Sequence, residues 1–90
     1  MDDLRFTPAT KREIEKFKNR TTREDYTRVS NAIRQLAENP RSTNSLKVKG
    51  KENTYRIRVG DYRIIYRIKD AQLLVLIIQV SRRNENTYNY

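Results

Sequence analysis

The stretch YRIRVGDYRIIYR, residues 55–67, decides the fold of this 90-residue chain. Apolar residues and arginines alternate on both sides of the pair Gly60-Asp61, which is typical of two β-strands joined by a two-residue turn. Glycine in the first loop position favours a type II′ turn. Such a turn fixes the register of the hairpin, so we predict that Arg58 faces Arg63 across the ladder.

The predicted hairpin has one apolar face and one basic face, because alternate residues of a strand point to opposite sides. The apolar face carries Tyr55, Ile57, Val59, Tyr62, Ile64, Tyr66 and Ile68. The basic face carries Arg56, Arg58, Arg63 and Arg67. Like charges opposite each other are destabilising, so we expect this face to bind an anion. The guanidinium fork suits phosphate oxygens or a phosphoryl transition state; the alternative is a solvated basic face.

Two helices are predicted before the hairpin. Thr7 and Pro8 read as the N-cap and first position of one helix. Thr21 or Thr22 offers the N-cap of a second helix, which should end at Asn39-Pro40. The second helix has an apolar stripe at offsets of three and four, formed by Tyr26, Val29, Ile33 and Leu36. Such a stripe needs a sheet to cover it.

The remaining apolar runs predict strands. Residues 3–6 (DLRF) alternate, and residues 45–49 (SLKVK) form a possible edge strand before Gly50, which is a turn or a point of close approach. Residues 54–59, 62–68 and 73–80 form a meander, with the last run apolar on both faces and therefore central. We predict one α+β domain over residues 1–90: a short N-terminal strand, then an antiparallel helical hairpin packed on a mostly antiparallel sheet of about four strands.

Positive charge is concentrated in the predicted sheet. The net charge is +9, and residues 41–69 hold nine basic and two acidic side chains. A field of this sign favours nucleic acid or an acidic protein as the partner.

The chain has neither cysteine nor histidine. This composition excludes disulfides, thiolate zinc sites and histidine-based nucleophile or acid–base pairs, and we expect no cofactor and no metal. The first residues carry no secretory signal, and the longest apolar run, 73–78, is far shorter than the roughly 20 residues of a membrane span. We expect a cytoplasmic protein with no membrane partner.

The residues LKVKGKENTYRIRVGDYRIIYRI (46–68) and VSRRNENTY (80–88) resemble the RelE toxins of toxin-antitoxin pairs, within the wider RelE/ParE superfamily. The similarity lies in an L-x-x-x-G lead-in, a Y-[KR]-I-[KR]-V strand, a Y-R-I-I-Y strand, and an arginine pair followed by a tyrosine. The resemblance implies a type II toxin that cleaves mRNA in the ribosomal A site and so inhibits translation. In that reaction the ribose 2′-oxygen attacks the adjacent phosphate.

The resemblance also implies the site residues. The catalytic residues would be Arg56, Arg58, Arg63, Arg83 and Tyr88. Further RNA contacts are expected from Lys47, Lys49, Lys51, Arg67, Arg82 and Tyr90. The family often has lysine at positions 56 and 58, and arginine is a poor base because its pKa lies above about 12. Tyr88, or groups of the mRNA and ribosome, would then take the proton, and Arg82 and Tyr90 are alternatives to Arg83 and Tyr88.

The expected partners are an acidic RelB-like antitoxin, mRNA on the ribosome and ribosomal RNA. A ParE-like toxin, which would inhibit DNA gyrase by protein binding without nuclease activity, is the alternative function. A plain RNA-binding domain is a third interpretation. It is disfavoured because Tyr55, Tyr62 and Tyr66 are predicted to point into the core rather than to stack on bases.

Overall fold

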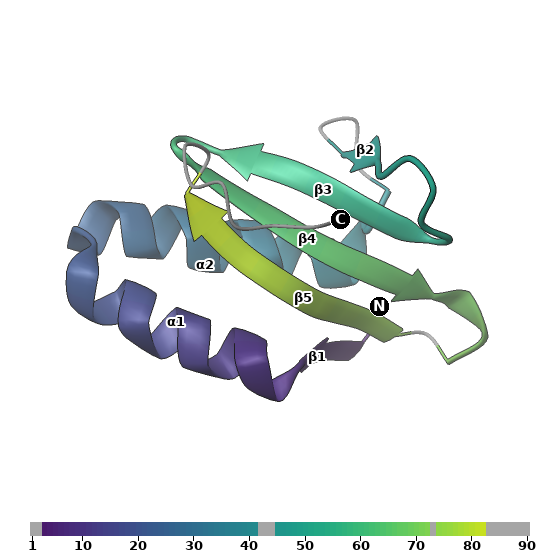
Figure 1. Ribbon diagram of the computed structural model, residues 1–90, viewed down its shortest axis with the longest axis horizontal. Coiled ribbons are helices and arrows are strands. Elements are labelled where there is room, and N and C mark those ends of the chain that lie inside the picture. The colour runs from purple at the N-terminus through teal and green to yellow at the C-terminus, as the bar shows by residue number, and fades with distance from the viewer. Residues whose placement is uncertain (1–2, 42–44, 73, 83–90) are drawn as a thin grey trace.

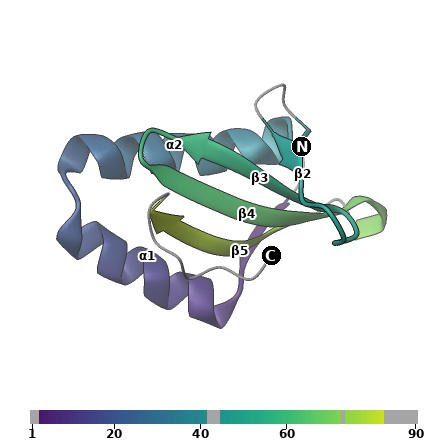
Figure 2. The same ribbon diagram turned by 45° about the horizontal axis from the view of Figure 1, so that its top comes forward.

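The computed structural model describes residues 3–41, 45–72 and 74–82. Its elements are β1 (Asp3–Phe6), α1 (Pro8–Arg20), α2 (Arg23–Glu38), β2 (Leu46–Lys47), β3 (Thr54–Val59), β4 (Tyr62–Lys69), a 3-10 turn (Asp70–Gln72) and β5 (Leu74–Arg82). The five strands form one sheet in the order β1-β5-β4-β3-β2. β1 is parallel to β5, and all other neighbours are antiparallel. Both helices cover the same face of the sheet (Figures 1 and 2).

The helix boundaries follow from threonine caps. The Thr7 side chain accepts a hydrogen bond from the Thr10 amide, and Pro8 occupies the first turn of α1, as predicted. Of the two candidate caps for α2, Thr22 takes the role, and its hydroxyl accepts a hydrogen bond from the Asp25 amide at 3.1 Å. In the described part of the chain, no helix is long and apolar enough to cross a membrane.

The β3–β4 hairpin has the predicted register. Arg58 pairs with Arg63, and the turn residue Gly60 has φ +58°. Asn53 is the one described residue other than glycine with positive φ, so Asp61 has negative φ. A positive φ followed by a negative φ is the type II′ pattern. The side chains of the whole hairpin therefore alternate between the two faces as the sequence indicates.

The core lies between the helices and one face of the sheet. The predicted α2 stripe packs there through Val29, Ile33 and Leu36. The sheet contributes fully buried Ile64, Tyr66, Ile68, Val75 and Ile77, each 0 % exposed. The seven residues predicted for the apolar face of the hairpin all belong to this core or pack against its edge.

The predicted α+β architecture is confirmed, with differences at the sheet edges. The sheet has five strands rather than about four, and the possible strand 45–49 is reduced to the two residues of β2. β5 is an interior strand as predicted, although β4 occupies the middle of the sheet. Gly50 has φ +80° and no atom within 4 Å of where a Cβ would stand. It therefore serves a turn and not a close approach.

A β-bulge interrupts the ladder between β4 and β5. Ile65 pairs with Gln79 whereas Tyr66 pairs with Ile77, so Ile78 is the extra residue in β5. The Ile78 carbonyl accepts a hydrogen bond from the buried Thr10 hydroxyl of α1. α1 thus lies along the edge of β5 beyond the end of β1.

Candidate functional site

The sheet face that the helices leave open carries a set of arginines. Opposed residues in a ladder share a face, so the register places Arg58 and Arg63 together. Arg67 and Arg5 both pair with Leu76 of β5, one from each side. We call this surface the arginine face; its basic residues are Arg5, Arg56, Arg58, Arg63 and Arg67.

Three of these arginines surround the hairpin turn. Arg58 is exposed, Arg63 is 9 % exposed, and Arg56 lies two residues before Arg58 and is half-buried. Directly opposed residues have Cβ atoms about 4.5–5.5 Å apart, which long side chains easily span. We call Arg56, Arg58 and Arg63 the hairpin clamp, because their guanidinium groups can converge on one anion.

Several arginines of this face lack a carboxylate partner in the part of the chain that the structure describes. Among the described residues, none of Arg56, Arg58 and Arg67 forms an ion pair with a carboxylate. The Nε atom of Arg67 is also buried and has no hydrogen-bond partner in this part of the chain. Since buried polar groups are costly without a partner, this face favours an anionic ligand or an acidic partner.

The floor of the arginine face is apolar in the middle and polar along β5. Ile65 is 0 % exposed, with Arg56 and Gln79 beside it in the neighbouring strands. Gln79 and Ser81 are both 7 % exposed, and Ser81 pairs with Arg63. Within the hairpin clamp, Arg58 is therefore the solvent-exposed member, whereas Arg63 is buried beside the polar Ser81.

The predicted lysines lie in and after β2. Lys47 pairs with Tyr55 and so belongs to the face that the helices cover, because Leu46 is the residue opposite Arg56. Lys49 and Lys51 are exposed in the connection from β2 to β3. Contact of these three lysines with RNA remains a prediction.

Four predicted site residues belong to the end of the chain. Arg82 is the last residue of β5, and its backbone pairs with that of Tyr62. Arg83, Tyr88 and Tyr90 lie outside the described residues. Their roles in catalysis and RNA contact therefore remain predictions.

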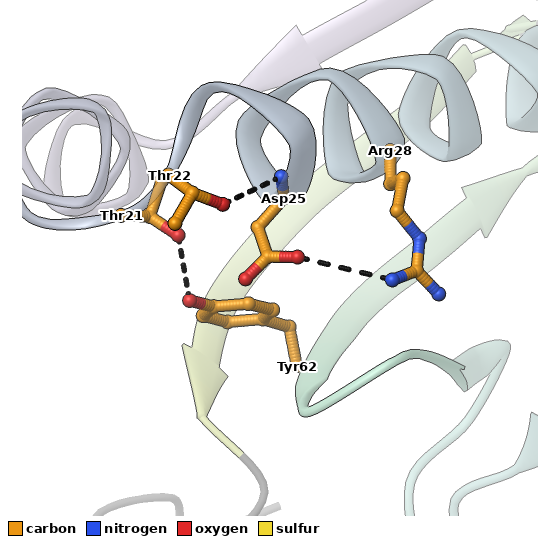
Figure 3. A network of polar contacts seen from close by, with 5 residues as sticks. All are labelled: Thr21, Thr22, Asp25, Arg28 and Tyr62. Carbon is orange, nitrogen blue, oxygen red and sulfur yellow. Dashed lines mark hydrogen bonds and ion pairs between the residues drawn. The ribbon is translucent and has the colours of Figure 1, made fainter.

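Two basic residues near the site did not figure in the sequence analysis. Arg5 reaches the arginine face through β1, and the alternation of DLRF was a usable signal for it. Arg28 of α2 lies over the hairpin turn, with Nη2 3.4 Å from where a Cβ on Gly60 would stand. Its Nη1 lies 3.8 Å from Oδ1 of Asp25 (Figure 3). No local pattern indicated Arg28, because its position depends on how α2 docks on the sheet.

A second polar cluster lies away from the clamp, where the segment after α2 meets β4. Arg41 binds Asp70 through two hydrogen bonds of 3.1 and 2.8 Å, which lower the pKa of the Asp70 carboxyl. The Tyr66 hydroxyl donates a 2.6 Å hydrogen bond to the Pro40 carbonyl. Burial raises the pKa of Tyr66 to about 12. Tyr66 is thus held protonated and serves the fold.

The family of the chain follows from its sequence. Residues 4–87 match the family of the ParE toxin of the type II toxin-antitoxin system, parDE. The chain belongs to this family and is therefore a toxin of a type II toxin-antitoxin system. A search of curated proteins finds no match.

Solved structures with the same fold are RelE-type toxins. The isolated Escherichia coli RelE toxin matches with a TM-score of 0.78 and 19 % identity, over 97 % of this chain and 89 % of that one. The Mycobacterium tuberculosis toxin-antitoxin complex RelBE2 matches at 0.73 and 26 %, over 91 % and 98 %. The Agrobacterium tumefaciens YoeB/ParE toxin matches at 0.75 and 19 %, over 89 % and 96 %. The chain thus belongs to the RelE/ParE superfamily and has the fold of RelE toxins, which confirms the predicted resemblance.

Proposed function

We propose that this toxin is a ribosome-dependent endoribonuclease of the cytoplasm that cleaves mRNA in the A site and inhibits translation. The observation that carries the proposal is the direct opposition of Arg58 and Arg63, with Arg56 on the same face. Three guanidinium groups around one point suit the extra negative charge of a phosphoryl transition state.

In the proposed reaction the ribose 2′-oxygen attacks the adjacent phosphorus, and the bond from phosphorus to the 5′-oxygen breaks. The products are a 2′,3′-cyclic phosphate and a 5′-hydroxyl. The clamp would hold the phosphate in line and neutralise its oxygens, and alignment alone can contribute several powers of ten in rate. Arginine does not give up its proton at neutral pH, so the proton of the 2′-hydroxyl would pass to Tyr88 or to a group of the ribosome or mRNA. The leaving 5′-oxygen would take up a proton from water to become the 5′-hydroxyl.

The proposed regulatory partner is an acidic RelB-like antitoxin. Similar folds occur in the E. coli RelBE toxin-antitoxin complex and in a RelE-RelB complex from Pyrococcus horikoshii. An acidic segment that covers the arginine face would compensate its charge, and it would keep RNA from the hairpin clamp.

The test is to express the toxin alone and map the 5′ ends of cellular mRNA. Wild type should arrest growth and cut messages on translating ribosomes. Arg63→Ala should lower cleavage on the order of a hundredfold, the typical cost of removing one donor to a transition-state oxyanion. Arg12→Ala is the matched control, because Arg12 is an exposed residue of α1, and it should cleave like wild type.

A ParE-like function is the second candidate, and the description of the matching family, which is that of the parDE toxin, favours it. In this alternative the chain binds DNA gyrase and cuts no RNA. Growth arrest with intact messages and gyrase-dependent DNA breaks would support it, above all if Arg63→Ala remains toxic.

A further inference from the structure

We propose that a cavity between α1 and the end of β5 binds one nucleotide of the RNA chain, next to the nucleotide held by the hairpin clamp. This inference rests on the proposed nuclease function and extends it to a second subsite. The cavity has a volume of about 280 Å³. That volume is slightly below the range of about 300–1,000 Å³ for small-molecule sites, so it suits a single nucleotide.

The cavity lies beside the clamp. Ser81 lines it and is also the residue opposite Arg63 in the β4–β5 ladder. Tyr62, the neighbour of Arg63 in β4, lines the same cavity. Ser81 therefore belongs both to the arginine face and to the cavity, whereas Tyr62 lines the cavity from the helix-covered face. An RNA chain that leaves the clamp would cross the end of β5 at Ser81 to reach the cavity.

The cavity has an ordered aromatic wall. Phe17 and Tyr62 pack edge to face with ring centroids 4.7 Å apart. The Tyr62 hydroxyl is hydrogen-bonded to the Thr21 hydroxyl at 2.7 Å, at the junction of α1 and α2 (Figure 3). Phe17 is half-buried, so its ring gives an apolar surface against which a nucleobase can pack, while Tyr62, which is 5 % exposed, belongs to the core and holds that ring in place.

Charged groups of α1 complete the site. Lys16 and Arg20 are exposed and line the cavity, where they can bind a phosphate of the RNA backbone. Glu13 also lines it, and its Oε1 accepts a hydrogen bond of 3.4 Å from the Val80 amide.

The test is an amide NMR titration of the full chain with the four nucleoside 5′-monophosphates, without ribosomes. The amides of Phe17, Arg20 and Ser81 should shift. Arg20→Ala should weaken binding by about five- to tenfold, the usual effect of losing one charge-assisted contact. Lys18→Ala is the matched control: both residues are exposed and lie in the last turn of α1, but only Arg20 lines the cavity. Lys18→Ala should bind the nucleotides as wild type does.

The possible results distinguish a failure of this inference from a failure of the proposed function. Shifts that are absent, confined to the hairpin clamp, or equally reduced by both variants would overturn the cavity as a nucleotide site, even if mRNA cleavage is observed. Cavity shifts that persist in a chain unable to cleave mRNA would overturn the nuclease and leave the cavity standing. If both hold, Arg20→Ala should also lower mRNA cleavage irrespective of the base beside the cut, and Lys18→Ala should not.

Discussion

The two faces of the sheet are built from alternate residues of the same strands, yet one is apolar and buried under the helices and the other is rich in arginine. On the helix-covered face, Ile57 and Ile64 are opposed, nearly inaccessible and packed against α2. One residue nearer the turn on each strand, Arg58 and Arg63 are opposed with like charges. Burial of the first pair stabilises the folded state, whereas repulsion between the second pair destabilises it. Stability and the proposed ligand binding therefore depend on different side chains of one hairpin.

The largest expected contrast is between Ile57→Ala and Arg58→Ala, which are neighbours on β3. Truncating buried Ile57 should lower the free energy of unfolding by about 2–4 kcal/mol, because it removes apolar contacts and leaves a cavity. Arg58→Ala should change it by less than about 0.5 kcal/mol, or raise it, because one of two opposed charges is removed. Urea unfolding followed by circular dichroism measures both. Equal losses would contradict the division between the faces.

A smaller effect is expected from the polar group on the helix-covered face. Tyr66→Phe should cost about 1–2 kcal/mol at neutral pH, because the Pro40 carbonyl loses its hydrogen bond. The tyrosine ionises near pH 10 in the unfolded chain, but its pKa is about 12 in the fold.

Between these two pH values the unfolded chain releases the Tyr66 proton while the folded chain keeps it. The free energy of unfolding of wild type should therefore be unaffected by this group below pH 10 and should fall as the pH rises toward 12. The Tyr66→Phe variant lacks this component, so its stability should decline less over the same range. Thermal unfolding between pH 8 and pH 12 gives the comparison, and parallel profiles would argue against a proton held at Tyr66.

The smallest expected effect is the stabilisation of the toxin by phosphate bound at the arginine face. Inorganic phosphate should stabilise the toxin more than chloride at equal ionic strength, because it binds the native hairpin clamp. The gain should be about 1 kcal/mol at a concentration about five times the Kd. Arg58→Ala should lose most of the gain, whereas Arg12→Ala should keep it. If chloride stabilises equally well, the clamp does not bind phosphate as a ligand.

The hairpin could be predicted from the sequence because its turn allows only one register. Gly60-Asp61 leaves two loop residues, and the alternation on both sides then assigns every side chain of β3 and β4 to a face. The threonine caps of α1 and α2 were equally local signals. This is why the positions of Arg56, Arg58 and Arg63 were known before any long-range contact.

Features that depend on distant segments were not predictable in the same way. The four residues of β1 do not reveal that their partner is β5, so Arg5 was not placed beside Arg67. The contact of Arg28 with the hairpin turn depends on the docking of α2. The cavity between α1 and β5 arises because β1 stops at Phe6 and a helix continues along the edge. Each requires the tertiary structure.

The extra residue in β5 reverses the face of the sheet to which each following side chain points. Without Ile78 as an insertion, Gln79 and Ser81 would point among the helices, and Val80 would lie against Arg63. In the sequence, the bulge coincides with the adjacent apolar residues Ile77 and Ile78, after which polar and apolar residues alternate up to Ser81. The bulge, and not composition alone, therefore determines which side of the sheet is polar where β5 ends.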